Sequence, residues 1–112
     1  MTSLKIQQLL PKKVLTSRDS ARSIAPQIAD AVRDANGGVE MDLQGVLGMA
    51  PSFFDELLSV IEKGARVAGK QPGEIIVSHP PSGLLPKHHL VCKGHGLKVS
   101  EDSSGRWVIT QA

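Results

Sequence analysis

The sequence predicts an α/β domain in which helices pack on a mixed central sheet that ends in a C-terminal hairpin. Three stretches carry this prediction: the alternating apolar and polar residues 39–43, the amphipathic helix that follows them, and the β-branched residues 73–77. A strand, a helix and a second strand in this order form a βαβ unit, whose crossover is right-handed. A chain of 112 residues is long enough for one hydrophobic core, so we expect a single domain over residues 1–112.

The composition excludes several classes of partner. The 13 basic and 11 acidic residues leave a net charge of +2, which is too balanced to indicate nucleic acid or an anionic membrane. The single cysteine, Cys92, excludes an internal disulfide and fits a reducing compartment. No stretch approaches the roughly 18 apolar residues of a membrane span, and residues 1–5 lack the apolar core of a signal peptide. We therefore expect a cytoplasmic protein with neither a membrane nor a nucleic-acid partner.

The N-terminal third predicts short strands and then a broken helix. Residues 4–15 predict two short strands around a Pro-Lys-Lys turn, because a proline cannot lie inside a central strand. Thr16 or Ser17 is expected to cap the next helix. Pro26 removes a backbone donor within that helix, so the helix should kink or restart there.

The central stretch predicts a strand, a turn and a helix. The Asn-Gly-Gly sequence at 36–38 ends the first helix, and Gly45 and Gly48 mark a turn after the strand. Ser52 and Asp55 have the spacing of a capping box at the start of the second helix. The apolar residues of that helix share one face: Phe54, Leu57, Leu58, Ile61, Ala65 and Ala68.

The C-terminal third predicts a strand, a short helix and a hairpin. Gly69 is expected to end the long helix, and the strand at 73–77 follows. A short helix lies within residues 84–96, and alternating apolar residues flank a turn at 102–105.

Residues of the central stretch resemble the middle of the bacterial STAS-like family, which is related to anti-sigma factor antagonists. In that family a strand that ends in aspartate runs through a glycine turn into a serine-led helix. Residues 17–22 resemble the start of the family's first helix, and the resemblance covers residues 14–77. The matching residues are Asp42, Leu43, Gly45, Val46, Ser52, Phe53, Glu56 and Leu57.

The resemblance implies a single STAS-like domain that acts as a regulatory protein-interaction module in bacterial signal transduction. Its partner would be an ATPase-like kinase, an anti-sigma-type protein or a sensor, and phosphorylation of Ser52 would regulate binding. The expected partner-binding residues are Ser52, Phe53, Glu56 and Asp42. The chain departs from the family pattern at Ala50 and Pro51, which replace the usual aspartate and first serine, and in its C-terminal hairpin.

Each of these residues also has a plainer interpretation. Ser52 alone is typical of a helix cap. Asp42 lies where catalytic groups gather at the carboxyl end of a strand, yet such a residue more often accepts hydrogen bonds from loop amides. Phe53, Val60 and Val67 recur every seven residues and indicate either internal packing or a partner surface.

A different class of function would centre on His88, Cys92 and His95. On a helix these three residues share one face and offer nitrogen and sulfur ligands for a metal, or a Cys–His pair for nucleophilic catalysis. The spacing fits none of the usual zinc patterns, and Gly94 is expected to end the helix before His95. We therefore predict no bound zinc, no cofactor and no enzymatic activity, with a small metal-binding or Cys/His enzyme as the alternative.

Overall fold

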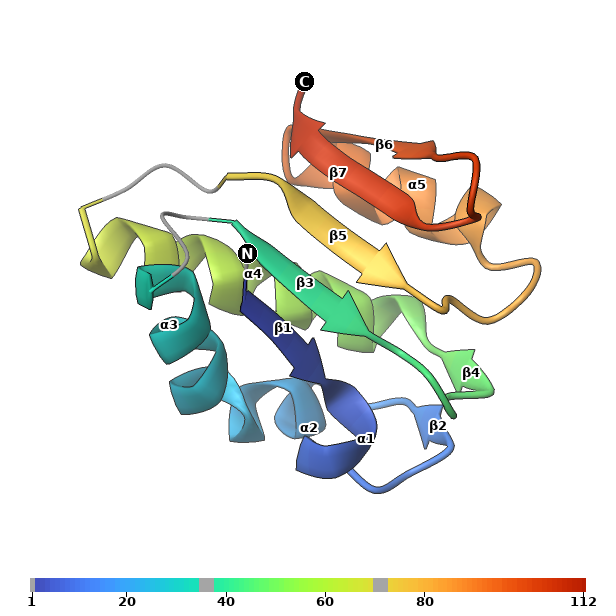
Figure 1. Ribbon diagram of the computed structural model, residues 1–112, viewed down its shortest axis with the longest axis horizontal. Coiled ribbons are helices and arrows are strands. Elements are labelled where there is room, and N and C mark those ends of the chain that lie inside the picture. The colour runs from blue at the N-terminus through green and yellow to red at the C-terminus, as the bar shows by residue number, and fades with distance from the viewer. Residues whose placement is uncertain (1, 35–37, 70–72) are drawn as a thin grey trace.

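The computed structural model describes residues 2–34, 38–69 and 73–112 of the chain (Figure 1). The helices are α1 Ile6–Leu9, α2 Arg18–Ser23, α3 Ala25–Asp34, α4 Pro51–Val67 and α5 Leu85–Gly94. The strands are β1 Thr2–Lys5, β2 Val14–Leu15, β3 Val39–Asp42, β4 Gly48–Met49, β5 Ile75–Ser78, β6 Leu97–Glu101 and β7 Trp107–Gln111. No helix of this described part is long and apolar enough to cross a membrane.

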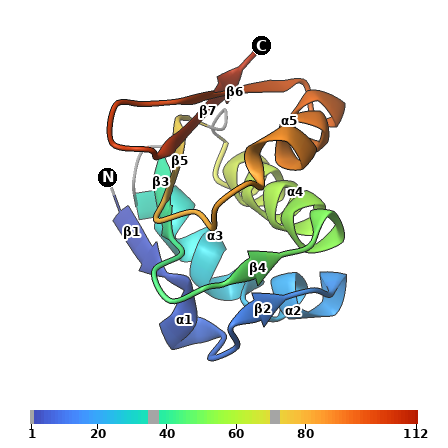
Figure 2. The same ribbon diagram turned by 90° about the vertical axis from the view of Figure 1, so that its right-hand side faces the viewer.

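Five strands form one mixed sheet in the order β1-β3-β5-β7-β6. Strands β1, β3 and β5 are parallel, whereas β7 is antiparallel to both β5 and β6. The predicted strands at 39–43 and 73–77 are therefore neighbours, with Val39 opposite Ile75, and the C-terminal hairpin is confirmed. Helices α3, α4 and α5 all lie on one face of this sheet (Figure 2).

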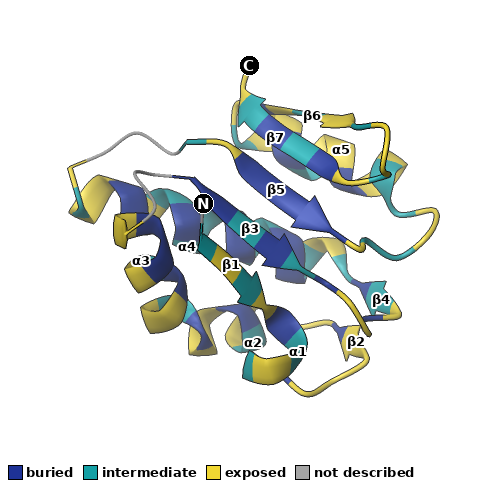
Figure 3. Cartoon of the chain, viewed as in Figure 1, coloured by how far each residue is buried: buried dark blue, intermediate teal, exposed yellow. Residues whose placement is uncertain are grey.

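The hydrophobic core lies between the sheet and this helical layer (Figure 3). Alternate residues of β3 are buried, because successive side chains of a strand point to opposite faces. Helix α4 contributes the largest apolar face, and the predicted residues Phe54, Leu57, Leu58, Ile61 and Ala65 are all buried. The α/β prediction is thus confirmed in both its layers.

The N-terminal third agrees only in part with the prediction. Residues 4–15 contain the end of β1, the single helical turn α1 and strand β2, so the residues after Lys5 are helical rather than extended. The Ser17 side chain caps α2 by accepting the Ser20 N–H at 3.1 Å. The helix is interrupted before Pro26, where α2 ends and α3 begins, as predicted. Of the predicted stop at 36–38, residues 36 and 37 lie outside the described residues.

Gly45 lies in the turn after β3 as predicted, but Gly48 does not, and a second small sheet follows the turn. Gly45 has a φ of +90°, which favours glycine, and the Val46 N–H donates to the Leu43 carbonyl oxygen at 2.9 Å. Gly48 belongs to strand β4, not to the turn, and β4 pairs in parallel with β2. Two-residue strands have no periodicity of their own, so only this pairing defines them.

The last third of the chain follows the prediction closely. Gly69 ends α4 with a φ of +72°, and α5 lies inside the predicted range 84–96. Asp102 organises the hairpin turn, because its carboxylate accepts the N–H groups of Ser104 and Arg106 at 2.9 and 3.0 Å. The Ser104 hydroxyl also donates to this carboxylate. That bond, followed by the bonds from Arg106 and from the Ser104 N–H, holds the pKa of Asp102 well below its ordinary value.

Candidate partner-binding face of helix α4

The small sheet of β2 and β4 brings the N-terminal ends of α2 and α4 together (Figure 2). The Ala50 N–H donates to the Leu15 carbonyl oxygen at 2.7 Å, and the Leu47 N–H donates to the Lys13 carbonyl oxygen at 2.6 Å. The two strands are parallel and each runs into its own helix. Thr16, before α2, and Arg18, its first residue, therefore meet residues of the first turns of α4, although more than thirty positions separate them in sequence.

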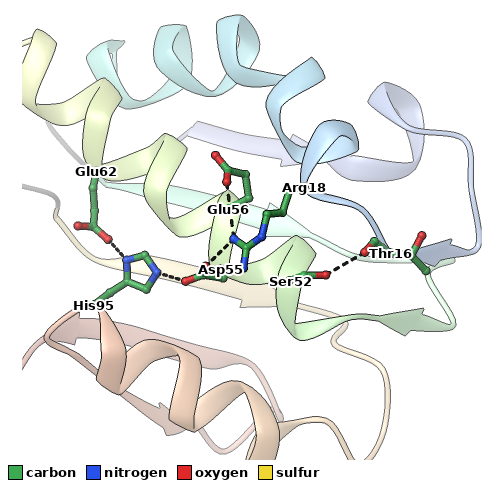
Figure 4. Close-up of polar contacts among 7 residues, drawn as sticks. All are labelled: Thr16, Arg18, Ser52, Asp55, Glu56, Glu62 and His95. Atoms are coloured by element: carbon green, nitrogen blue, oxygen red, sulfur yellow. Dashed lines mark hydrogen bonds and ion pairs between the residues drawn. The ribbon is translucent and has the colours of Figure 1, made fainter.

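Ser52 lies in the first turn of α4 but does not cap the helix. The cap position is Ala50, which makes no side-chain bond there, and Pro51 occupies the first helical position. The Ser52 hydroxyl instead donates to the Thr16 carbonyl oxygen at 3.0 Å (Figure 4). The predicted capping box with Asp55 is therefore wrong. Because Pro51 begins the helix, Ser52 is its second residue, two positions past the cap, and joins α4 to the segment before α2.

Asp55 lies at the centre of an ionic network between three helices (Figure 4). Its carboxylate accepts from the guanidinium of Arg18 at 2.6 Å and contacts Nε2 of His95 at 2.5 Å. Arg18 also lies 3.7 Å from the Glu56 carboxylate. The bond from Arg18, and then the bond from His95, lower the pKa of Asp55 below its ordinary value.

The ring of His95 bridges two carboxylates of α4. Nε2 contacts Asp55 and Nδ1 contacts Glu62, each at 2.5 Å, and only 13% of the His95 side chain is exposed. A carboxylate accepts hydrogen bonds, and a neutral imidazole has a single N–H to donate. Both contacts are hydrogen bonds only when the ring is a protonated imidazolium. We call Asp55, Glu62 and His95 the His95 clasp.

The remaining predicted partner residues differ in how accessible they are. Glu56 retains 20% exposure on the outer side of α4, beside Arg18. Phe53 is fully buried in the core, so its side chain is not accessible to a partner protein. Val60 is half-buried and Val67 is exposed, so the seven-residue pattern divides between core packing and surface.

Asp42 lies at the carboxyl end of β3, away from α4. It accepts the Gln44 N–H at 2.9 Å and lies 2.9 Å from Nδ1 of the exposed His79. Burial acts to raise the pKa of Asp42, but these two bonds, together with the charges of His79 and Lys5, outweigh it, and the pKa lies below its ordinary value. A small hollow of about 230 Å³ adjoins this residue, lined also by Lys5 and Gln7. The loop-amide interpretation of Asp42 is confirmed.

His88, Cys92 and His95 do not converge on one point. His88 is buried with its ring 4.9 Å from Phe54 and 5.5 Å from Trp107, between centroids. Cys92 is also buried, and burial raises the pKa of its thiol to about 11. His95 turns instead toward α4. Within the described residues no three histidine, cysteine or acidic side chains are grouped to hold a metal ion.

Burial also determines the protonation state of the His88 ring. Nδ1 donates to the Leu84 carbonyl oxygen at 2.9 Å, and the buried Nε2 has no hydrogen-bond partner among the residues that the structure describes. Burial lowers the pKa of His88, and the carbonyl groups of Leu84 and Met49 oppose that shift only in part. The ring is therefore a neutral member of the aromatic core.

A groove of about 600 Å³ runs along α4 on the side that faces the α2–α3 segment. Its apolar lining consists of small side chains, and charged groups stand among them. The residues that line it are Arg22, Ala25, Pro26, Ala29, Glu56, Ser59, Val60, Lys63, Gly64, Arg66 and Val67. The same helix therefore carries Ser52, the His95 clasp and one wall of a groove.

The partners of His95 are not evident from the sequence pattern. Asp55 and Glu62 are seven residues apart on a helix, which places them on one face where a single cation reaches both. The glycines around His95 place it at the C-terminal end of α5. The signal was therefore present in two separate segments, but only their packing shows that the segments meet.

Comparison with known proteins gives no relative for this chain. No protein-family model matches it, and no match is found among the curated proteins or the solved structures.

Proposed function

We propose that this chain is a STAS-like protein-interaction module of bacterial signal transduction, which binds a partner protein through the outer face of α4. The observation that carries the proposal is the groove of about 600 Å³ along this helix, whose lining includes Glu56 of the predicted site. Ser52 lies on the same helix, one turn before Glu56. The resemblance at residues 42–57 supports an ATPase-like kinase, an anti-sigma-type protein or a sensor as the partner.

Phosphorylation of Ser52 is the proposed means of regulation. A phosphate adds about −1.5 to −2 charges, and it would replace the hydroxyl hydrogen that now bonds the Thr16 carbonyl oxygen. The new charge would lie close to Asp55 and Glu56 in the next turn. Arg18 forms ion pairs with both of these carboxylates. We expect the phosphate to compete for Arg18 and so to change the surface at the start of α4.

Site-specific photo-crosslinking in cells tests the docking face. A photoreactive amino acid replaces Ser59, which lines the groove, and in a matched control it replaces Lys98, which is exposed on β6. We expect a discrete adduct with one protein from position 59 and none from position 98. That protein, purified, should then bind the parent chain and bind Val67→Asp more weakly, because Val67 is 81% exposed on the groove wall. Equal adducts from both positions would contradict the proposal.

A further inference from the structure

We propose that the groove between α3 and α4 binds an acidic amphipathic helix of the partner protein. This inference rests on the proposed function, because it gives the chemistry of the segment that occupies the docking face. It follows from the shape of the groove and from the balance of its charges.

The shape of the groove suits the apolar edge of a helix. Gly64 brings α4 close to α3, since a Cβ added there would lie 3.3 Å from the Cα of Ala29. The small side chains of Ala25 and Ala29 form one wall, and Val60 and Val67 stand on the other. A partner helix fills such a groove with apolar residues at i, i+3, i+4 and i+7.

The charges along the groove are predominantly positive. Its lining contains three cations, Arg22, Lys63 and Arg66, and the single acidic residue Glu56. Glu56 already faces Arg18 at 3.7 Å, and Arg22 is held by Asp19 at 2.7 Å. Lys63 and Arg66 form no ion pair with any of the described residues. Carboxylates on the flanks of a bound helix would complement these two exposed cations.

The other occupants fit these charges less well. A second copy of the chain in a two-fold dimer would bring Lys63 and Arg66 against their own equivalents around the axis. A nucleic acid would place phosphates against Glu56 and would gain only two cations that lack ionic partners. A small-molecule site normally has fixed polar groups within an apolar pocket, and here the charged side chains Lys63 and Arg66 are exposed at the surface.

Synthetic peptides of stated charge test the inference on the full chain. The probe is a helical peptide of roughly five turns with leucine and alanine on one face and glutamate on its flanks. One matched peptide carries lysine in place of glutamate, and another carries glutamine. Affinity is measured by fluorescence anisotropy at low and high salt, and the binding site is mapped by amide chemical shifts. We expect the acidic peptide to bind at least about tenfold more tightly than the basic one, with shifts in α3 and α4 and weaker binding in salt.

Charge reversal on the protein provides the decisive comparison. The double variant Lys63→Glu/Arg66→Glu should lose the acidic peptide and favour the basic one. The control Lys87→Glu/Lys93→Glu changes the net charge equally at exposed positions of α5 and should bind like the parent. A preference for the basic peptide, shifts outside the groove, or self-association that covers it would overturn the inference.

The outcomes also separate this inference from the proposed function. Equal binding of the acidic and glutamine peptides in the groove would overturn the acidic partner and support docking on α4. Failure of all three peptides would overturn the inference, while the crosslinks from position 59 would still decide the proposed function.

Discussion

Toward α3, helix α4 packs through small apolar groups, whereas toward α5 it is joined by charged side chains. On the α3 side Gly64 meets Ala29, and the groove that remains leaves Lys63 and Arg66 without ionic partners in the described chain. On the α5 side, His95 contacts two carboxylates of α4 in the His95 clasp. Close packing of small residues is insensitive to salt, whereas contacts between charged side chains weaken as the ionic strength rises. One side of α4 is thus joined to its neighbour by charged side chains, and the other side retains an open groove.

The largest effect is expected where α3 and α4 approach. Gly64→Val should destabilise the fold by about 1–3 kcal/mol, because overpacking a close contact forces the backbone to shift. The added Cβ already lies 3.3 Å from the Ala29 Cα, and valine adds two further methyl groups. Gly64→Ala is the matched control, since its single methyl group also removes the unfavourable helix propensity of glycine, worth about 1 kcal/mol. Urea unfolding of both variants measures the difference, and equal stabilities would show that the α3 side is loosely packed.

The next effect is expected on the α5 side, in the His95 clasp. A double-mutant cycle of His95→Ala and Glu62→Ala should give a coupling of about 1 kcal/mol, as for a geometrically favourable ion pair that is mostly removed from water. The coupling should weaken in high salt. Urea unfolding at two ionic strengths measures it, and a coupling near zero at low salt would show that the clasp adds nothing to the packing of α5.

The two sides also differ in how well the sequence predicts them. The apolar face of α4 and the alternation in β3 each arise from the pattern of apolar residues within one continuous segment. Periodicity therefore predicts both. Ser17 and Ser52 each stand where the sequence predicts the start of a helix, and only Ser17 is a helix cap. Ser52 is not a cap because α4 begins one residue earlier, at Pro51. The small β2–β4 sheet and the His95 clasp depend on segments that meet only after folding. They are therefore the features that the sequence could not specify locally.

A third prediction concerns His88, the buried histidine of α5. The pKa of His88 lies below its ordinary value of 6.5, so between the two values the unfolded chain binds more protons than the folded chain. The stability that His88 contributes is thus complete above 6.5 and falls as the pH drops through that value toward the folded-state pKa.

The variant His88→Gln should remove this part of the acid sensitivity, because glutamine does not titrate. His89→Gln is the matched control, since His89 is the exposed neighbour on the same helix. Urea unfolding between about pH 5 and 8 avoids most carboxylate titration. If all three chains lose stability equally across this range, burial of His88 does not govern the acid response.

The smallest effect on stability is expected at Ser52, where the open and closed sides of α4 begin. Ser52→Ala removes one hydrogen bond to the Thr16 carbonyl oxygen and should cost about 0.5–1.5 kcal/mol. Ser52→Asp loses the same donor and adds a negative charge near Asp55, so it should destabilise the fold further. Both variants are compared with the parent by thermal melting and by titration with the crosslinked partner. If Ser52 is a regulatory site, Ser52→Asp should weaken or strengthen partner binding severalfold while Ser52→Ala binds like the parent, because only the charge imitates a phosphate. Equal binding of all three chains, with differences confined to the melting temperature, would leave Ser52 a purely structural link between α4 and the segment before α2.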